Sequence, residues 1–466
     1  MLTRNRNTGH DFGGRSVGAG SLSIWTHNLK SFEFIPSYTS SVYSGMAARI
    51  GAGVEGWELF NHMAANNISL VAPGFPTVGV GGGWFANGGH GTLTSSFGLG
   101  ADQVLSLNVV TADGRFLTAD PTQNQDLFWA LRGGGGSTFG VVTSVVMKAY
   151  PPLTTVIFDL SFSVNHFPPY PLPGQPPIEY PGGGPGAGTN NTLTDVETFW
   201  KGINLAYHYA NNVLDAGGMV FSYIWPVASD RFYFTAAHRL VNVSSAEALA
   251  LARPLYQQLN ELGINVTLPA NLVPTSYAGN GGRTGSTGNP KNTRYRSRLL
   301  PRSNWEDSEL FGETFGVIRK AVEEGQYTFH GSAYSPTREV AGSPGADSAV
   351  NPAWRETVLH AMLMEIWPAD LSAQEATEGD ARVHAYIDGL KAVSPGAGSY
   401  MNEGDPTEKG WQQSFYGANY PRLLEIKKKV DPWGVFWAQT TVGSEGWKVA
   451  TADGYPGSQN GRLCRA

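Results

Sequence analysis

Cysteine is almost absent from this chain, since Cys464 is the only one among 466 residues. A single cysteine excludes an internal disulfide framework and any metal site built from several thiolates. Charged residues are also few, at 15%, and the formal net charge is −6. Because lysine and arginine are scattered, the chain lacks the basic stripe of a nucleic-acid-binding protein and the polybasic patch of a membrane-surface protein.

Long apolar runs are missing as well. No stretch of eighteen consecutive apolar residues occurs, so no segment resembles a membrane-spanning helix. Residues 1–7 contain no apolar segment of the kind found in a signal peptide. Four Asn-x-Ser/Thr sequons, at Asn67, Asn190, Asn242 and Asn265, are nevertheless typical of secreted proteins. We therefore expect the full-length protein to be secreted and glycosylated, although this chain begins without a signal peptide.

Glycine is abundant instead, with 59 residues, and it is concentrated in residues 79–91. So many glycines in one loop let the backbone approach a ligand closely and offer amide N–H groups to a pyrophosphate or an electron-rich ring. A nicotinamide-binding fingerprint is a rival interpretation, but Trp84 stands where its third glycine should fall, and no helix is expected there. A glycine-rich surface loop without a ligand is the simplest alternative.

The hydrophobic pattern predicts an α+β chain whose first unit extends to residue 151. Its expected helices and strands lie at residues 22–25, 56–66, 68–72, 104–111, 126–132 and 139–147, with a hairpin turn at Asp113-Gly114. A proline-rich loop at residues 168–185 interrupts the pattern, because no packed element accepts that density of proline.

A second unit is expected over residues 152–396, as an antiparallel sheet backed by helices on one face. Three of its helices should begin at capping boxes opened by Thr194, Ser244 and Ser372. Residues 276–302, rich in Gly, Ser, Thr and Arg, are expected to form a loop. A third part, residues 397–443, is dense in motifs and should fold back onto the first unit.

Four separated motifs stand out along the chain: Thr8-Gly-His-Asp-Phe-Gly-Gly-Arg-Ser16; Pro76-Thr-Val-Gly-Val-Gly-Gly82; Asp126-Leu-Phe-Trp-Ala-Leu-Arg-Gly-Gly-Gly-Gly136 with Phe139-Gly-Val-Val142; and Tyr400-Met-Asn402 with residues 419–423. Together they resemble the berberine-bridge-enzyme-like FAD-linked oxidoreductases, which carry the PCMH-type flavin domain of vanillyl-alcohol oxidase. Within this family the segments Trp25-Thr-His-Asn-Leu29 and Gly88-Gly-His90 look most like the fungal isoamyl-alcohol-oxidase-like members.

The resemblance implies FAD as the cofactor, with a single covalent link through His10. Some members add a second link through a cysteine before the Pro-Thr-Val-Gly motif, where this chain has Phe75. The resemblance also implies a set of cofactor-binding residues: Gly9, His10, Asp11, Pro76, Val78, Gly79, Gly81, Gly82, Gly88, Val141, Val142, Asn402 and Asn419.

The start of the sequence departs from the family pattern, because family members carry a further N-terminal lobe that completes the FAD pocket. The expected fold is therefore a PCMH-type FAD-binding domain, residues 1–151, with its N-terminal lobe missing. A substrate domain, residues 152–396, and the berberine-bridge-like segment, residues 397–443, follow it.

The resemblance does not identify the base that takes a proton from the substrate. Glu365 is one candidate, because the apolar residues around it in the sequence disfavour its charged form, and an ion-paired structural role is the alternative. Tyr416 and Tyr334 are further candidates. His90 is expected to pack within the cofactor loop rather than bind a ligand. His27 and His62 lack metal-ligand spacing, so no metal site is expected.

These observations predict an FAD-dependent oxidase that converts a small-molecule alcohol to a carbonyl and reduces O2 to H2O2, in secondary metabolism. Oxidases of a sugar or an amine are alternatives, and so is a truncated, non-catalytic remnant without a complete flavin site. The protein is expected to act as a monomer, without nucleic acid or membrane.

Overall fold

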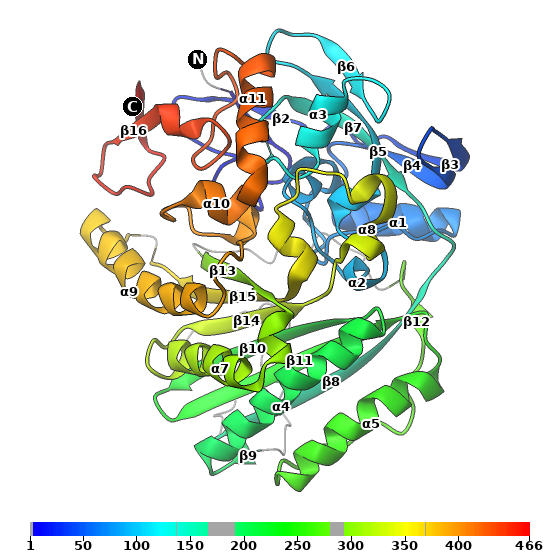
Figure 1. Cartoon of the computed structure of the whole chain (residues 1–466), viewed down its shortest axis with the longest axis vertical. Helices are drawn as coiled ribbons and strands as arrows, with labels where there is room; N and C mark the ends of the chain where they lie inside the picture. Colours follow the sequence, from blue (N-terminus) through cyan, green and yellow to red (C-terminus); the bar gives the residue numbers. More distant parts are fainter. Residues whose placement is uncertain (1–2, 137, 166–191, 280–292, 369) are drawn as a thin grey trace.

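The computed structural model describes residues 3–136, 138–165, 192–279, 293–368 and 370–466. Two large sheets dominate it, one in the upper and one in the lower half of Figure 1. Among the described helices, none is both long enough and apolar enough to span a bilayer. The predicted proline-rich loop at residues 168–185 lies outside the described residues.

The upper sheet has five antiparallel strands in the order β3-β4-β7-β5-β6. Helix α1 (Gly56–Asn66) buries Leu59 and Met63 in the core of this unit, as the spacing of apolar residues predicts. The strands are β3 (Phe32–Thr39), β4 (Ser44–Gly51), β5 (Val104–Val110), β6 (Phe116–Ala119) and β7 (Val141–Lys148), and the short helices α2 (Thr94–Phe97) and α3 (Gln125–Leu131) connect parts of it.

The lower sheet follows the order β12-β8-β11-β10-β14-β15-β13, with antiparallel pairing along the whole path. Its strands are β8 (Thr154–Val164), β10 (Met219–Ala228), β11 (Arg231–Val241), β12 (Thr275–Ser276), β13 (Thr293–Pro301), β14 (Thr328–Ala333) and β15 (Thr357–Ile366), and β9 (Thr192–Leu193) adds a short parallel pairing to β8.

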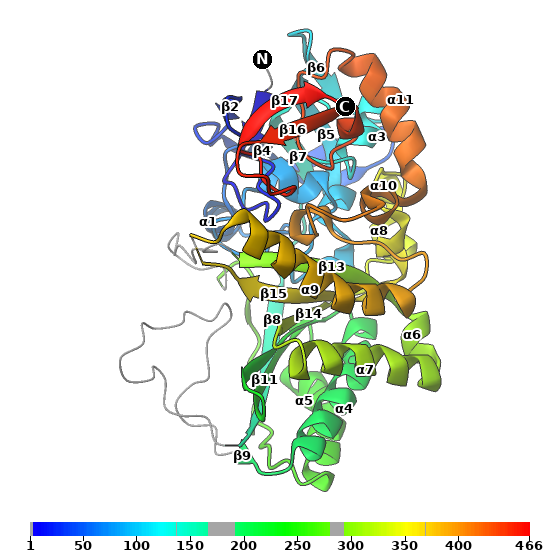
Figure 2. The same ribbon diagram turned by 90° about the vertical axis from the view of Figure 1, so that its left-hand side faces the viewer.

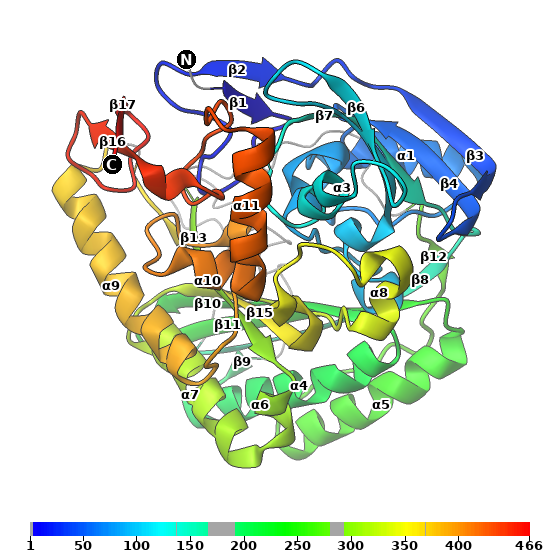
Figure 3. The same cartoon turned by 45° about the horizontal axis from the view of Figure 1, so that its top comes forward.

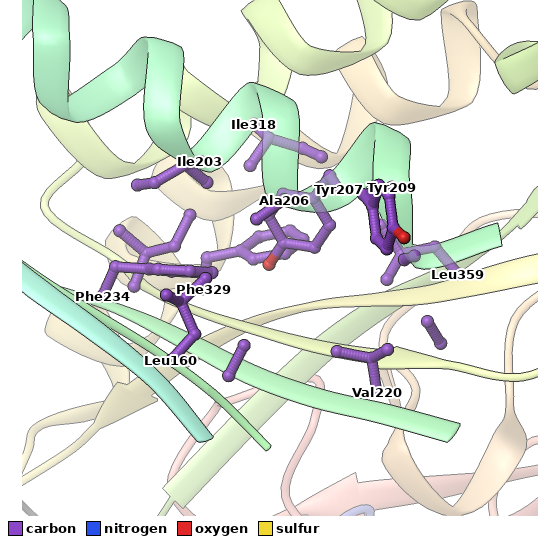
Figure 4. Close-up of a cluster of buried hydrophobic side chains, with 14 of the residues drawn as sticks. Leu160, Ile203, Ala206, Tyr207, Tyr209, Val220, Phe234, Ile318, Phe329 and Leu359 are labelled. Carbon is purple, nitrogen blue, oxygen red and sulfur yellow. The ribbon is translucent and has the colours of Figure 1, made fainter. Parts of the chain in front are cut away.

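Helices cover one face of this lower sheet, which confirms the predicted architecture (Figure 2). They are α4 (Val196–Asp215), α5 (Ser245–Glu261), α6 (Ser303–Glu306), α7 (Ser308–Glu323) and α9 (Ala373–Ala392). Figure 4 shows Ile203 and Tyr207 of α4 packed over Phe234 and Phe329 of the sheet. Burial of such aromatic side chains supplies much of the stability of this layer.

Most helix starts agree with the sequence. Ser244 and Ser372 form the predicted reciprocal capping boxes with Glu247 and Glu375. Helix α4 differs, because the Asp195 side chain, not that of Thr194, accepts hydrogen bonds from its first amide groups. Aspartate caps a helix as well as threonine does, so the helix begins one residue later.

Strand β13 contradicts the predicted loop at residues 276–302, of which residues 280–292 lie outside the described part of the chain. Arg294, Arg296 and Arg298 alternate along β13, and this alternation gave the segment a polar pattern. Arg296 and Arg298 are buried because they pair with carboxylates, Arg296 with Asp380 and Asp405 and Arg298 with Glu408. Paired arginines therefore occupy strand positions that the pattern alone assigns to a loop.

The C-terminal segment returns to the upper unit, where both termini lie at the same end of the molecule (Figures 1 and 3). The backbone N–H of Thr3 donates to the carbonyl of Val435 at 2.8 Å. The elements of this region are β1 (Thr3–Arg6), β2 (Leu22–Trp25), α8 (Arg338–Gly345), α10 (Trp411–Tyr416), α11 (Tyr420–Val430), β16 (Trp447–Thr451) and β17 (Gly461–Arg465).

Candidate active site

The glycine-rich segment is fixed at its beginning by helix α1. The carbonyls of Pro76 and Val78 accept hydrogen bonds from Trp57 N at 2.8 Å and Gly56 N at 2.9 Å. These two carbonyls satisfy N–H groups at the helix start, which have no partner within the helix. After them the chain forms a wide turn, η1 (Val80–Trp84), in which Gly81 and Gly82 have non-helical dihedral angles.

The His10 loop lies directly against this turn. Gly79 N donates to Thr8 Oγ1 at 3.2 Å, and His10 Nε2 lies 2.6 Å from Thr77 Oγ1. A Cβ atom on Gly79 would overlap the Asn7 side chain, so any larger residue here would have to displace Asn7. The structure thus brings together the first two sequence motifs.

Asp11 and Arg15 anchor the His10 loop to the C-terminal segment. Arg15 Nη1 donates to Asp11 Oδ2 at 2.9 Å and to the carbonyl of Met401 at 3.0 Å, and Arg15 Nε donates to the carbonyl of Gln439 at 2.9 Å. Arg15 is buried, so these contacts satisfy a charge that is largely removed from water. Asp11 therefore positions the loop through Arg15.

Asn402 connects the same loop with the glycine-rich turn. Its carbonyl accepts from Phe12 N at 3.0 Å, and its Nδ2 donates to the carbonyl of Gly83 at 3.0 Å. Its Oδ1 accepts from Asn87 Nδ2 at 2.7 Å. Asn402 thus lies where three distant segments meet.

The remaining predicted cofactor residues differ in position. Gly88 adopts φ +116°, which favours glycine, and Val141 and Val142 begin β7 beside β5. Asn419 Nδ2 donates to the carbonyl of Val350 at 2.9 Å, and within the described part of the chain no contact joins Asn419 to His10 or Asn402. The structure therefore does not bring Asn419 into this group.

A compact group of ionisable and aromatic side chains lies next to Asn402, and we call it the acid–base cluster. Its carboxylate, Glu403, lies between two imidazoles: His90 Nε2 is 3.4 Å from Oε1, and His360 Nδ1 is 3.6 Å from Oε2. The members of the acid–base cluster are His90, Tyr334, Trp354, His360, Tyr400 and Glu403.

Local structure explains how each ionisable member reaches this point. Trp84 Nε1 donates to the carbonyl of His90 at 3.0 Å and fixes its backbone after two glycines with positive φ. Glu403 ends the short turn η4 (Met401–Glu403), directly after Asn402. His360 lies in β15, where successive side chains point to opposite faces of the sheet.

Aromatic rings surround His90. The ring of Tyr334 stacks on it with centroids 5.2 Å apart, and the rings of Tyr400 and His360 approach edge-on at 5.3 and 5.7 Å. The hydroxyl of Tyr334 is buried and has no hydrogen-bond partner among the described residues. An unpartnered buried hydroxyl costs free energy unless a ligand satisfies it, so Tyr334 is a group that a substrate could bind.

Within the acid–base cluster, the Glu403 carboxylate carries a negative charge and the His360 imidazole is neutral. Burial raises the pKa of Glu403, but His90, His360 and His10 lower it, and the balance lies below the ordinary glutamate value. Burial lowers the pKa of His360 to about 3. At neutral pH, Glu403 is therefore ionised while His360 is uncharged.

The structure places Glu365 away from the acid–base cluster. Leu359, Ala361 and Leu363 of β15 belong to the core under the helices, and Glu365 continues this face. Its Oε2 accepts a hydrogen bond from Trp367 Nε1 at 2.7 Å. Sequence alternation grouped Glu365 correctly with Ala361 and Leu363, but the face that they share packs against helices and not against the His10 loop.

Tyr416 also lies apart from the acid–base cluster. Its buried hydroxyl donates to the carbonyl of Thr440 at 3.1 Å and lies 3.0 Å from Met401 Sδ. Burial raises its pKa, which disfavours a role as base. Of the three proposed catalytic residues, only Tyr334 lies in the acid–base cluster.

Sequence reasoning missed His360 and Glu403 and expected His90 only to pack. The signal for Glu403 was its place directly after Asn402 in a motif already singled out. The signal for His360 was an imidazole in the apolar strand that also carries Glu365, on the opposite face. No single-sequence pattern shows which face of a buried strand meets the cofactor domain.

A separate cavity of about 710 Å³ lies between β1 and the β16–β17 hairpin, lined in part by Arg4, Trp433, Trp437 and Trp447. No histidine or carboxylate lines it. The chemistry of the acid–base cluster, rather than this open volume, therefore defines the candidate active site.

Comparison with known proteins agrees with this arrangement. Residues 3–120 match the FAD binding domain family, and residues 399–443 match the "Berberine and berberine like" family. The FAD-linked oxidoreductase patO of Aspergillus clavatus is 37% identical over 479 residues, which cover 99% of this chain and 73% of patO. The VAO-type flavoprotein oxidase VAO615 of Thermothelomyces thermophilus is 34% identical over 466 residues, which cover 99% of this chain and 74% of VAO615.

Solved structures of flavoproteins also match this chain. The VAO-type flavoprotein MtVAO615 from Myceliophthora thermophila C1 matches with a TM-score of 0.82 and 32% identity, over 100% of this chain and 78% of that one. Berberine bridge enzyme from Eschscholzia californica matches with a TM-score of 0.70 at 16% identity, over 95% of this chain and 85% of that one, and shares the fold. The chain belongs to the berberine-bridge-enzyme-like family of FAD-linked oxidoreductases.

The residues of the candidate site fit an FAD group. The Asn7 side chain occupies the space that a Cβ atom on Gly79 or Gly82 would need, so these glycines allow the Asn7 amide to lie against the turn. A Cβ on Gly83, in contrast, would meet nothing nearer than Asn402 Oδ1 at 3.8 Å. Arg6 Nε and Asn7 Oδ1 are buried without hydrogen-bond partners among the described residues. These polar groups and glycines provide the donors and the space that a pyrophosphate and a flavin ring require.

Proposed function

We propose that this protein is an FAD-dependent oxidase that converts a hydroxyl group on a small organic molecule to a carbonyl group. The substrate carbon loses a hydride and its hydroxyl loses a proton, and dioxygen takes up both electrons and two protons to give hydrogen peroxide. FAD, when bound, supplies the two-electron acceptor between these half-reactions. The printed description of VAO615 as a flavoprotein oxidase supports dioxygen as the final acceptor.

The observation that carries this proposal is the position of Glu403. Its Oε2 is buried without a hydrogen-bond partner among the described residues, although the carboxylate lies between His90 and His360. Glu403 and His10 also affect each other's pKa, so the carboxylate lies in the electrostatic environment of His10, the residue proposed to link the flavin. An ionised, unsatisfied acceptor at this place suits a base that takes the hydroxyl proton.

The other members of the acid–base cluster orient the substrate and restrict water. The unpartnered hydroxyl of Tyr334 can donate a hydrogen bond to the substrate oxygen. Trp354, Tyr400 and Tyr334 enclose His90 with aromatic surface, which strengthens electrostatic interactions inside the cluster by excluding water. No lysine or arginine belongs to the acid–base cluster, so uncharged alcohols are favoured over acids.

The test compares Glu403 of η4 with Glu365 of β15, the candidate base that the sequence alone favoured. A panel of alcohols is screened for peroxide, and flavin bleaching is then followed by anaerobic stopped flow. Glu403→Gln should reduce flavin about a hundredfold more slowly, the usual scale for losing a general base. Glu365→Gln, the matched control, should reduce flavin at the parental rate.

Two results would contradict the proposal. If Glu403→Gln reduces flavin as fast as the parent, Glu403 is not the base. If no alcohol bleaches the flavin while an amine does, the substrate class is wrong. A protein that purifies without flavin absorbance supports the non-catalytic alternative.

A further inference from the structure

His90, His360 and Glu403 point toward one common space. One potential ligand atom of each lies within 4.8 Å of the others. The two nitrogen–oxygen separations, 3.4 Å to His90 and 3.6 Å to His360, are longer than the roughly 2.7–3.2 Å of an N–H···O hydrogen bond. The three side chains therefore converge on this space with at most long, weak contacts between them.

Three polar atoms of this group lack hydrogen-bond partners. Both ring nitrogens of His360 are buried without a hydrogen bond among the described residues, and His360 has 0% of its surface exposed. Glu403 Oε2 is buried and has no hydrogen-bond partner there either. The ion pair between His90 and Glu403 Oε1 leaves these three atoms without a hydrogen bond, and buried polar atoms without partners are costly. A cation bound between the three side chains would satisfy His360 and Glu403 together.

The two separations that involve Glu403 match the coordination geometry of zinc. Ligand bonds of about 2.0–2.1 Å in a tetrahedral site place neighbouring ligand atoms about 3.4 Å apart. The 3.4 and 3.6 Å separations need shifts of only a few tenths of an ångström. Two imidazoles and one carboxylate are a common zinc ligand set that leaves a fourth position open, whereas magnesium prefers oxygen ligands.

We propose that His90, His360 and Glu403 form a binding site for a divalent transition-metal cation of the zinc class, and that bound metal blocks oxidation. The lone pairs that would bind the cation include those of Glu403, which would otherwise accept the hydroxyl proton. The blocking effect rests on the proposed function, but binding of the cation does not.

Binding is tested directly on the flavin-loaded protein. After chelator treatment, the protein is dialysed against micromolar ZnCl2, and bound zinc is measured by mass spectrometry. The expected result is one zinc per chain, lost in His360→Ala and Glu403→Gln. The control is His62→Ala on α1, which should keep the metal because His62 stacks on Phe32 far outside this ligand group. Cobalt should add visible bands of a four-coordinate site.

The variants are first compared by far-ultraviolet circular dichroism. If His360→Ala does not fold, His90→Gln replaces it, since His90 lies on a loop and is partly exposed. Equal zinc uptake by the parent and by folded ligand variants would overturn the proposal, and so would the absence of zinc uptake by the parent.

Inhibition separates this site from the proposed function. Zinc should raise KM for the alcohol without changing kcat, EDTA should reverse the effect, and magnesium at the same concentration should have none. If one zinc binds per chain without inhibiting oxidation, the metal site is supported, but the proposal that the substrate contacts Glu403 is wrong. If Glu403→Gln loses turnover and the parent protein takes up no zinc, the oxidase function is supported and the metal site is wrong.

Discussion

His10 has the chemical state that a covalent bond to flavin requires. Burial lowers its pKa, and Glu55 and Glu403 act in the opposite direction without cancelling this effect. At neutral pH its imidazole is therefore uncharged and keeps a lone pair on one ring nitrogen. His10 contacts Thr77 and Phe75, and no cysteine stands nearby in the chain to add a second bond.

We expect flavin to be linked to the protein through His10 alone. After acid precipitation, the yellow colour should stay in the pellet of the parent protein and be lost from the pellet of His10→Ala. His27→Ala is the control, because His27 lies on a partly exposed loop and should not affect the link. Retention of flavin by denatured His10→Ala would show that another residue carries the bond.

Individual residues of the site were predictable to different degrees. His10, Gly79 and Asn402 were found because glycine patterns and motif order survive in a single sequence, and the structure brings them together. Glu403 and His360 were missed because their importance depends on contacts between distant segments. Such contacts leave no local pattern, whereas a glycine that must permit close approach does.

At the scale of elements, helix α9 is joined to the C-terminal segment through His384. Its Nε2 forms a hydrogen bond with the carboxylate of Asp405, which also forms an ion pair with Arg296 on β13. This hydrogen bond raises the pKa of His384, while burial and Arg296 oppose the change. A raised pKa in the folded state means that folding favours the protonated histidine.

The contribution of His384 to stability should depend on pH. This stabilisation is fully present at pH values below the pKa of histidine in the unfolded chain, about 6.5. It is lost as the pH rises through the higher pKa of His384 in the folded protein. His384→Gln should therefore lower the free energy of unfolding by about 1–3 kcal/mol at pH 6, and by less at pH 9. Urea unfolding of both proteins at the two pH values measures this difference. An equal loss at pH 6 and pH 9 would rule out a contribution from protonation.

Elements with a clear period were predicted well, and those with buried charges were not. Helix α1 and the capping boxes at Ser244 and Ser372 follow local rules that need no tertiary contact. Strand β13 was taken as a loop because its arginines find their carboxylates on α9 and in the C-terminal segment. The partner of a charge, and not the charge itself, decides whether it can be buried.

At the scale of the whole molecule, one buried ion pair joins the two sheet units. Arg355 lies in η3 (Pro352–Glu356), just before β15, and Asp102 lies in η2 (Gly100–Gln103), just before β5. Two hydrogen bonds of 2.8 and 2.7 Å join the guanidinium and the carboxylate. Asp102 is fully buried, so the pair is sheltered from water.

Removing one partner should destabilise the protein strongly. Asp102→Asn leaves Arg355 buried without a counter-charge and should cost about 3–5 kcal/mol, measured by chemical unfolding. Asp126→Asn is the matched control, because Asp126 and Arg422 form an exposed pair, which should contribute no more than about 1 kcal/mol. Similar losses in both variants would mean that burial of the Asp102 pair does not determine its strength.

Three sequons lie at exposed positions, where glycans could be attached if the protein is secreted as we propose. Asn67, Asn242 and Asn265 are exposed, while Asn190 lies outside the described residues. Expression through a secretory host should give a protein whose apparent mass falls after treatment with an endoglycosidase. Peptide mapping should find glycans at these three asparagines. A secreted product with no glycan at any of them would contradict the expectation.

The contact between Arg15 and Met401 has a consequence for the order of events during synthesis. These residues are 386 positions apart, and their contact fixes the loop that carries His10. At about 5–20 residues per second, a ribosome needs roughly 20–80 s to travel that distance. The His10 loop therefore lacks this contact until the segment that contains Met401 has been synthesised. We therefore expect flavin capture to follow the synthesis of Met401, so that a chain interrupted before this residue should not hold its cofactor.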